Sequence, residues 1–398
     1  MAPTTRRPLD PMDLAGIDDL LSDEEKAVRS TVRTFLDERV EPHVADWFER
    51  GELDDVRGLT KELGALGLLG MHLDGYGCAG MSAVDYGLAC LELEATDSGV
   101  RSLVSVQGSL AMFAIHRWGS EEHKQQWLPQ LAAGEAIGCF GLTEPDHGSD
   151  PASMRTRARR DGDDWVLDGA KMWITNGSIA DVAVVWAQAG EEHGGIRGFV
   201  VPTTTPGFSA PLIKHKMSLR ASVTSELVLD GVRLPADAVL PEVRGLKGPL
   251  SCLSEARYGI VWGSLGAARS SLDTARRYSM EREQFGRPLA GFQLTQQKLA
   301  DMALELVKGQ LLALHLGRRK DAGTLRPEQV SLGKLNNIRE ALDICRTSRT
   351  ILGANGISLE YPVIRHMNNL ESVLTYEGTV EMHTLVIGQA MTGQQAFR

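Results

Sequence analysis

The sequence predicts an α+β protein in three successive parts: a helical N-terminal domain, a central antiparallel β-barrel or sandwich, and a C-terminal four-helix bundle. At 398 residues the chain exceeds the size that one hydrophobic core usually supports, so several packed units are expected. Apolar residues recur at helical spacing before Gly138 and after Pro249, whereas short apolar runs between turn signals fill the middle. We therefore expect domains over residues 1–138, 139–245 and 246–398.

The first part shows a clear helix start. Ser22 followed by Glu25 is typical of a capping box, and apolar residues then recur three and four positions apart, from Val28 to Leu36. Further helices are predicted over Ser82–Thr96 and Ser102–Trp118. The glycine-rich segment 75–80 is predicted to be a loop between helices.

The middle part has the pattern of a sheet. Trp165–Leu167, an Asp168-Gly169 turn and Met172–Ile174 predict a β-hairpin. Further strands are predicted at Val182–Trp186, Gly198–Val201 and Leu227–Leu229, the last leading into a second Asp-Gly turn at residues 230–231. This spacing favours a small antiparallel barrel or sandwich.

Helical patterns return in the last part. The predicted helices are Cys252–Glu283, Phe292–Ala322, Pro327–Leu352 and Thr379–Met391. Four consecutive helices indicate an antiparallel bundle. The segment 241–249, which holds two prolines and two glycines, is expected to join the bundle to the β part.

Composition excludes several functions. The formal net charge of -10 opposes binding to nucleic acids and anionic membranes. Five scattered cysteines without a Cys-x-x-Cys pair predict neither disulfides nor a zinc site, and they fit a reducing, cytoplasmic location. No run of about 18 apolar residues occurs, so no membrane insertion is expected. The start of the chain lacks the long apolar stretch of a secretion signal.

Two segments of the middle part are suited to a flat, anionic cofactor such as a flavin. Residues 140–150 are rich in small and hydroxyl side chains, which lets backbone amides approach an anion, and residues 173–176 place a tryptophan beside a threonine. An ordinary acidic turn and a core tryptophan are equally consistent with these patterns. Fingerprints of a nicotinamide site, a P-loop, a metal helix and a serine nucleophile are missing, so no metal is predicted.

Glu377 is the candidate base. It stands between an aromatic residue and a glycine in an apolar segment, and desolvation raises the pKa of a carboxyl group. A glutamate at a helix start would have the same surroundings. Arg101, close to a predicted helix start, is a candidate ligand for a carboxylate, although most single arginines are merely solvated.

Five motifs occur in order, and with them the chain resembles the acyl-CoA dehydrogenase family over residues 20–397. The motifs are Leu142-Thr143-Glu144-Pro145 with Gly148-Ser149-Asp150, Trp173-Ile174-Thr175-Asn176, Arg282-Glu283-Gln284-Phe285-Gly286, Gly353-Ala354-Asn355-Gly356 and Tyr376-Glu377-Gly378-Thr379. The resemblance implies a β-barrel middle domain, bound FAD, and Glu377 as the base that removes the α-proton of an acyl-CoA.

The resemblance also implies the site residues. It assigns FAD binding to Phe140, Leu142, Thr143, Ser149, Trp173, Ile174, Thr175, Arg282, Phe285, Gln293, Gly353 and Thr379. Among these, Arg282 and Gln293 would come from a neighbouring subunit of a homotetramer. It assigns substrate binding to Arg101, Ser102, Glu94, Ser149, Arg257 and Tyr376. Thr350, Ala354 and Glu381 depart from the common family pattern, which affects the expected flavin contacts at that end.

Within the family, Arg101 and the segments around it are most similar to dehydrogenases of glutaryl-CoA. This similarity implies that Arg101 and Ser102 bind the distal carboxylate, and that oxidation is followed by decarboxylation to crotonyl-CoA and carbon dioxide. Electrons would pass to an electron-transfer flavoprotein. The alternatives are a short-chain or branched acyl-CoA dehydrogenase, a glutaryl-CoA dehydrogenase that does not decarboxylate, and a family member that only binds flavin or nucleic acid.

Overall fold

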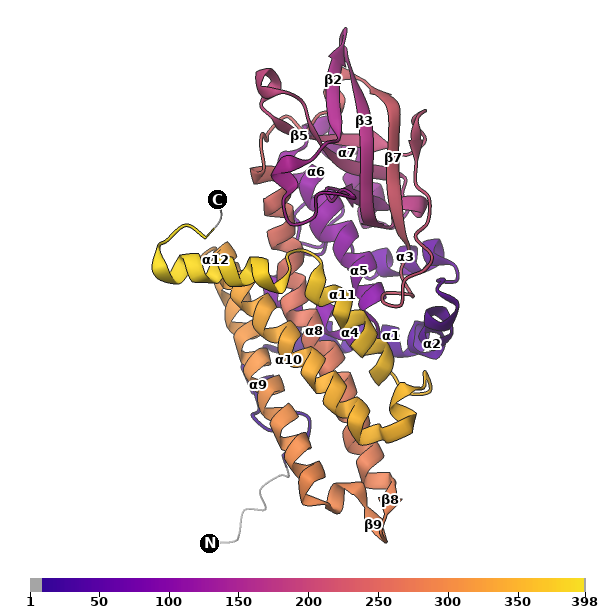
Figure 1. Cartoon of the computed structure of the whole chain (residues 1–398), viewed down its shortest axis with the longest axis vertical. Helices are drawn as coiled ribbons and strands as arrows, with labels where there is room; N and C mark the ends of the chain where they lie inside the picture. The colour runs from indigo at the N-terminus through magenta and orange to yellow at the C-terminus, as the bar shows by residue number, and fades with distance from the viewer. Residues whose placement is uncertain (1–8, 397–398) are drawn as a thin grey trace.

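The computed structural model describes residues 9–396 and confirms the predicted order of a helical, a β and a second helical part (Figure 1). The β part lies at one end of an elongated molecule, and the long C-terminal helices extend toward the other end. No helix among the described residues is long and apolar enough to cross a membrane. All five cysteines are free thiols.

The first part contains helices α1 to α7. Their bounds are Asp23–Arg39, Glu41–Arg50, Val56–Ala65, Ala83–Thr96, Ser98–Ser105, Phe113–Trp118 and Glu121–Ala132. The predicted capping box is present, because the Ser22 hydroxyl accepts from the Glu25 amide at 3.2 Å and the Glu25 carboxylate accepts from the Ser22 amide at 2.8 Å. The predicted helix 102–118 is one continuous rod in which α5 and α6 are joined by a π-helical segment, Val106–Met112.

Gln107, in that π-helical segment, joins the first part to the sheet. Its amide group donates to the carbonyls of Leu131 at 3.0 Å and Ala136 at 2.9 Å, and its carbonyl oxygen accepts from the Gly138 amide at 2.7 Å. Because the side chain is fully buried, these bonds fix where strand β1 leaves the helices.

The β part is one curled sheet of seven strands. The strands β1 to β7 are Gly138–Gly141, Arg157–Asp161, Asp164–Thr175, Val182–Gln188, Ile196–Pro202, Phe208–Ser209 and Thr224–Leu234. Their order is β1-β4-β2-β3-β7-β6, with β5 paired to β4. Most pairs are antiparallel as predicted, but β4 is parallel to both β1 and β2, because the connections that reach it are long rather than hairpin turns.

The predicted hairpin at Asp168-Gly169 is wrong. Both Asp-Gly pairs lie inside long strands, at an irregularity where β3 pairs with β7. The Asp168 carboxylate accepts from the Gly231 amide at 2.8 Å, and both glycines have positive φ, +148° at Gly169 and +62° at Gly231. The glycines therefore permit a local bulge in two facing strands instead of reversing the chain.

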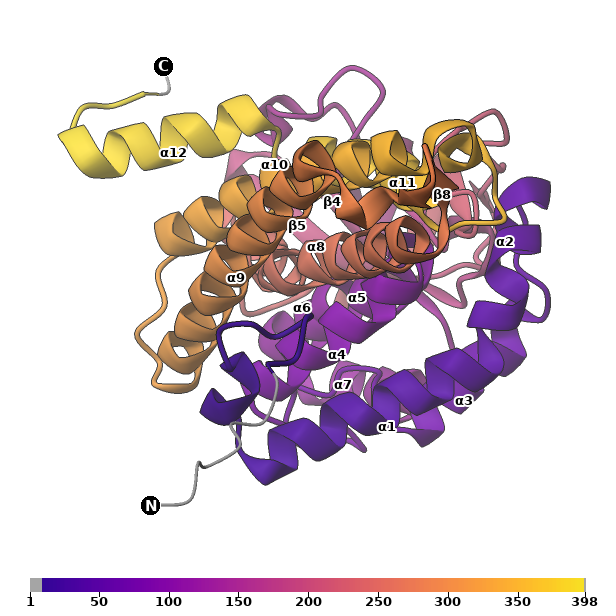
Figure 2. The same cartoon turned by 90° about the horizontal axis from the view of Figure 1, so that it is seen from below.

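The C-terminal part contains five helices. Helices α8 to α12 are Lys247–Glu281, Gln293–Asp321, Pro327–Leu352, Val363–Thr375 and Val380–Thr392, and a small hairpin of β8, Glu283–Gln284, and β9, Arg287–Pro288, follows α8. Helix α11 was not among the predicted helices. Helix α12, which was predicted as the fourth bundle helix, projects to one side of the molecule (Figures 1 and 2).

Candidate active site

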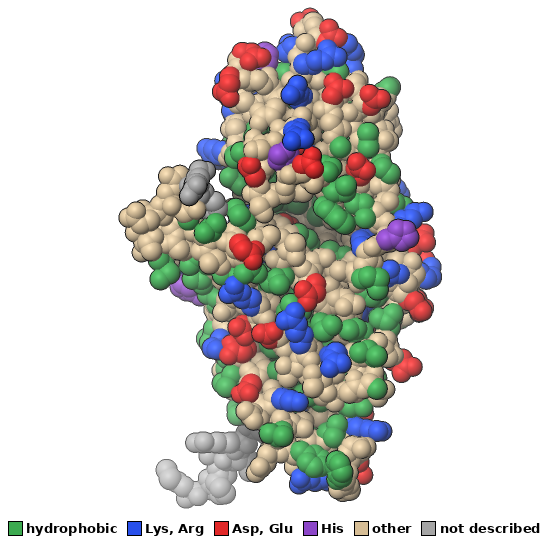
Figure 3. Space-filling model, viewed as in Figure 1, with side chains coloured by type: hydrophobic (Ala, Val, Ile, Leu, Met, Phe, Trp, Pro, Cys, Tyr) green, Lys and Arg blue, Asp and Glu red, His purple; other side chains and the backbone are tan. Residues whose placement is uncertain are grey.

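Glu377 lies in the short turn between α11 and α12. On one face of the molecule the surface is hollowed between the β part and the C-terminal helices (Figure 3). Its φ of +53° is in the left-handed region, which residues with a side chain adopt at a cost of about 1–3 kcal/mol. Gly378 follows at φ +100°, and a Cβ there would lie 2.8 Å from His383 Nε2. The surrounding structure therefore imposes an unusual backbone on the candidate base.

Two cations hold this turn through its carbonyl groups. Lys334 Nζ, from α10, donates to the Tyr376 carbonyl at 2.6 Å and the Gly378 carbonyl at 2.7 Å. Arg257 Nε, from α8, donates to the Glu377 carbonyl at 2.7 Å. All three successive carbonyls are satisfied by side chains, so the loop stays defined although it lacks helical hydrogen bonds.

The carboxylate of Glu377 is left free by these contacts. Its Oε2 is buried and has no hydrogen-bond partner within the described residues. Burial raises the pKa of Glu377 above its usual value, while Arg101, Lys334 and Arg257 oppose that shift. A buried, unpaired carboxylate with a raised pKa is suited to take a proton from a bound substrate.

Arg101 lies fully inside the protein beside the base. Its Nε donates to Glu94 at 2.7 Å, and its Nη2 donates to the Tyr376 hydroxyl. Ser98 donates to the second oxygen of Glu94 at 2.8 Å. The exposed fractions are 1% for Arg101 and 0% for Glu94, so this is a buried ion pair that orients the guanidinium.

Arg101 keeps free hydrogen-bonding capacity. A guanidinium has five N–H donors, and no hydrogen bond of its Nη1 is found among the described residues. The Ser102 hydroxyl lies 3.5 Å from the Tyr376 hydroxyl, to which Arg101 also donates. Burial opposes the charge of Arg101, but Glu94 and Tyr376 raise its pKa well above the usual value, so it stays a cation.

Gly263 on α8 makes room for the carboxylate of Glu94. A Cβ at this position would lie 2.1 Å from Glu94 Oε2, far inside van der Waals contact. At Gly266, one turn further, a Cβ would lie 1.9 Å from the Leu91 carbonyl. The two helices approach closely because α8 presents glycines to α4, and this packing sets the position of the Glu94–Arg101 pair.

The segments predicted to bind a flat cofactor lie side by side. The Met172 amide donates to the Thr143 carbonyl at 2.8 Å, which joins the loop after β1 to β3. A second irregularity of β3 falls between Lys171 and Ile174. This irregularity directs the side chain of Trp173 toward the surface: the residue has φ +64° and is 60% exposed. A bulge that directs an aromatic ring outward beside two threonine hydroxyls fits a flavin.

A buried ion pair supports this edge of the sheet. Lys171 Nζ donates to Glu144 at 2.8 Å and to the Leu142 carbonyl at 3.1 Å, and Glu144 also accepts from the amides of Arg155 and Thr156. Although burial opposes ionisation, these hydrogen bonds lower the pKa of Glu144 to about 2. The pair fixes the backbone on both sides of Thr143.

The remaining predicted residues are dispersed. Phe140, Leu142 and Ile174 are buried, and Ser149 is exposed in the loop after β1. Arg282, the 94%-exposed Phe285 and Gln293 lie at the hairpin after α8, at the opposite end of the molecule from the sheet (Figure 1). Gly353 follows α10, and Thr379 caps α12 by accepting from the Met382 amide at 3.4 Å. One chain therefore does not bring the hairpin residues to Trp173.

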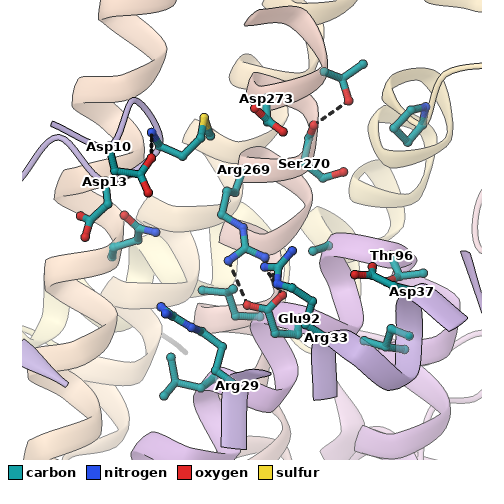
Figure 4. Close-up of a pocket in the computed structure, with 18 of the residues that line it drawn as sticks. Asp10, Asp13, Arg29, Arg33, Asp37, Glu92, Thr96, Arg269, Ser270 and Asp273 are labelled. Atoms are coloured by element: carbon teal, nitrogen blue, oxygen red, sulfur yellow. Dashed lines mark hydrogen bonds and ion pairs between the residues drawn. The ribbon is translucent and has the colours of Figure 1, made fainter. Parts of the chain in front are cut away.

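A cleft of about 740 Å³ lies elsewhere, between the N-terminal segment, α1, α4 and α8 (Figure 4). Arg33 and Arg269 both bind the buried Glu92, the latter at 2.6 Å. Arg29 pairs with Asp18 at 2.6 Å. These arginines of the cleft are thus paired with neighbouring carboxylates. Neither Glu377 nor Arg101 lines the cleft.

Comparison with known proteins identifies the family. Family models described as the N-terminal, middle and C-terminal domains of acyl-CoA dehydrogenase match residues 22–135, 139–232 and 244–392. Bovine mitochondrial short-chain specific acyl-CoA dehydrogenase is 35% identical over 371 residues, 92% of this chain and 90% of that protein. The chain belongs to the acyl-CoA dehydrogenase family.

Two solved structures are particularly similar to this family member. A crystal structure of glutaryl-CoA dehydrogenase from Mycobacterium smegmatis is 71% identical, with a TM-score of 0.96, and the match covers 98% of this chain and 100% of that one. A glutaryl-CoA dehydrogenase from the same organism in complex with FADH2 is 65% identical, with the same TM-score and the same coverage. The predicted family resemblance is confirmed.

Sequence reasoning missed three residues of this site: Lys171, Gly263 and Lys334. Lys334 had a readable signal, because it lies four residues after Val330 and four before Ile338, on the apolar face of its helix. The other two had none, since their roles depend on contacts with residues far away in the sequence.

Proposed function

We propose that the protein is an FAD-dependent dehydrogenase of glutaryl-CoA that decarboxylates its product to crotonyl-CoA. The observation that carries the substrate assignment is the buried Arg101 beside Glu377, whose Nη1 makes no hydrogen bond in the part of the chain that the structure describes. The 71% identity to the glutaryl-CoA dehydrogenase from M. smegmatis supports it.

The charge of the site supports a dicarboxylic substrate. Three cations, Arg101, Arg257 and Lys334, surround two carboxylates, Glu94 and Glu377. One positive charge therefore remains when all five groups are ionised. A buried charge without a partner is costly, and the distal carboxylate of a glutaryl group would neutralise it through Nη1 of Arg101 and the Ser102 hydroxyl.

FAD fits the face formed by Thr143, Trp173 and Thr175. No hydrogen bond of either threonine hydroxyl is found among the described residues, so both are available to a ring system stacked near Trp173. Bound FAD would supply the hydride acceptor for the substrate β-carbon. The chain's own part is to hold the thioester so that its α-carbon faces Glu377.

Glu377 takes the α-proton as a hydride leaves the β-carbon, which forms the conjugated double bond. In the product the distal carboxylate is placed to leave. Its carbon–carbon bond breaks, carbon dioxide departs, and the electron pair enters the conjugated thioester. Glu377, now protonated, returns its proton to the terminal carbon and yields crotonyl-CoA.

The test is anaerobic reduction of the bound flavin by a panel of acyl-CoA esters, with product masses recorded. Glutaryl-CoA should bleach the flavin fastest and yield crotonyl-CoA. Faster bleaching by butyryl-CoA would replace the proposal by a short-chain activity. Release of glutaconyl-CoA would retain the substrate but remove the decarboxylation.

We also propose a homotetramer that passes electrons to an electron-transfer flavoprotein. Phe285, 94% exposed, and Met391, 82% exposed on the projecting α12, are apolar surfaces suited to cover by a neighbouring subunit. A neighbour would also supply Arg282 and Gln293 to the cofactor. Light scattering of the purified holoenzyme measures the number of subunits. The cytoplasmic location of the protein stays a prediction.

A further inference from the structure

Lys334 is an unusual lysine. It is 1% exposed and makes no ion pair within the described residues, whereas lysines are seldom fully buried unless an acid pairs with them. Two hydrogen bonds of its ammonium group are instead made to the turn that carries Glu377. It donates to the carbonyl before that residue at 2.6 Å and to the carbonyl after it at 2.7 Å.

These two bonds act on the backbone of Glu377 from both sides. When one ammonium group binds the carbonyls of residues 376 and 378, the peptide plane before Glu377 and the one after Gly378 must both face it. That restraint supports the left-handed φ of +53°, which the residue would otherwise leave for a region of lower energy. The carboxylate itself receives no hydrogen bond from Lys334 and stays free to react.

The charge of Lys334 also reaches the carboxylate. The groups that face Glu377 are Arg101 on α5, Arg257 on α8, Lys334 on α10, Glu94 on α4, His383 on α12 and the neighbouring Tyr376. Arg101 is already paired with Glu94, and burial lowers the pKa of His383 to about 3, so this histidine is neutral. Within residues 9–396, Lys334 and Arg257 are thus the two cations of this group that have no ion-paired carboxylate of their own.

We propose that Lys334 is a positioning residue for proton abstraction: it holds Glu377 in its reactive backbone conformation, and its positive charge keeps that carboxylate ionised. The inference rests on the proposed role of Glu377 as base. Burial lowers the pKa of Lys334 to about 7, so its charge is adjustable near neutral pH. A lysine buried for packing alone would not be aimed at both carbonyls beside the base.

The experiment compares three variants of the holoenzyme. Lys334→Met removes the charge and the donors, Lys334→Gln removes the charge but keeps two shorter-reaching N–H donors, and Lys334→Arg keeps both. Lys308→Met, which removes a 63%-exposed lysine from α9, is the matched control. The measurements are kcat and kcat/KM for glutaryl-CoA between pH 5 and pH 9 (roughly the range of enzyme titrations), with FAD content and melting temperature.

Lys334→Met should lower kcat by roughly 100-fold, the size of effect that a misplaced catalytic group produces. Removing a nearby positive charge disfavours the carboxylate, so the acid limb of kcat/KM should move to higher pH by about one unit in the Met and Gln variants. In Lys334→Arg the acid limb of kcat/KM should stay at its wild-type pH, and Lys308→Met should match the wild type in both rate and pH profile.

An acid limb that is unchanged in both neutral variants would overturn the inference, because a purely structural lysine alters stability without moving that limb. If the Met variant does not fold, the Gln variant decides by the same criterion. Glu377→Gln separates this inference from the proposed function. If it keeps the wild-type rate, the base assignment fails; if it is inactive while the Lys334 variants behave as wild type, only the role of Lys334 fails.

Discussion

Replacing the Glu94–Arg101 pair by neutral residues should remove the preference for a dicarboxylic substrate. Arg101→Met alone is a poor test, because it leaves Glu94, with 0% exposure, as an unpaired buried charge. Such a charge costs about 3–5 kcal/mol and would affect every substrate. The double variant Glu94→Gln with Arg101→Met removes both charges and leaves the net charge beside Glu377 unchanged.

The expected loss of kcat/KM for glutaryl-CoA follows from the burial of the Glu94–Arg101 pair. Removing one partner of a desolvated, hydrogen-bonded charge pair costs about 2–5 kcal/mol in binding. At about 1.4 kcal/mol for each factor of ten, kcat/KM for glutaryl-CoA should fall roughly 30-fold to several thousand-fold. Butyryl-CoA has no distal carboxylate and should lose less than about tenfold, since it depends only on packing.

The assay is steady-state kcat/KM for both esters with the wild type and the double variant, at equal FAD occupancy. The ratio of the two constants is the readout, because a general loss of folding lowers both equally. Equal losses for both esters would refute the reasoning and make the pair structural.

Four further predictions concern single positions. Glu377→Gln should bind FAD normally and lose at least about 100-fold in kcat, which stopped-flow reduction of the flavin measures. Lys171→Met should lower the free energy of unfolding by about 3 kcal/mol, because it leaves Glu144 unpaired. In the wild type, Glu144 has a folded pKa of about 2, below the value of 4.5 for a free side chain. The contribution of Glu144 to the free energy of unfolding is therefore complete above pH 4.5 and is lost as the pH falls toward 2. Melting temperatures measured over this acid range check this prediction. Gly263→Ala should displace Glu94 and lower the preference for glutaryl-CoA over butyryl-CoA, with a loss of about 1–3 kcal/mol of stability.

Local sequence signals predicted what depends on neighbouring residues. The Ser22 capping box and the helix that ends at Thr96 were found where spacing placed them. Asp168-Gly169 was misread because an Asp-Gly pair serves a turn or a bulge equally well, and the facing strand, some 60 residues later, selects between them. The projecting position of α12 was missed for a similar reason, since an apolar helix face indicates burial without naming its partner.

The base and the substrate-binding charge belong to one electrostatic system. Arg101 and Lys334 both lower the pKa of Glu377 against the effect of burial, and Arg101 is the group that would meet a distal carboxylate. Binding of that carboxylate at Arg101 brings a negative charge close to Glu377 and cancels the positive charge that remains in the site. The pKa of Glu377 therefore rises further, and Glu377 becomes a stronger base when the correct substrate is in place. A monocarboxylic ester brings no such negative charge and leaves Glu377 the weaker base. Discrimination between the two substrates is therefore expected in the rate of proton transfer as well as in binding.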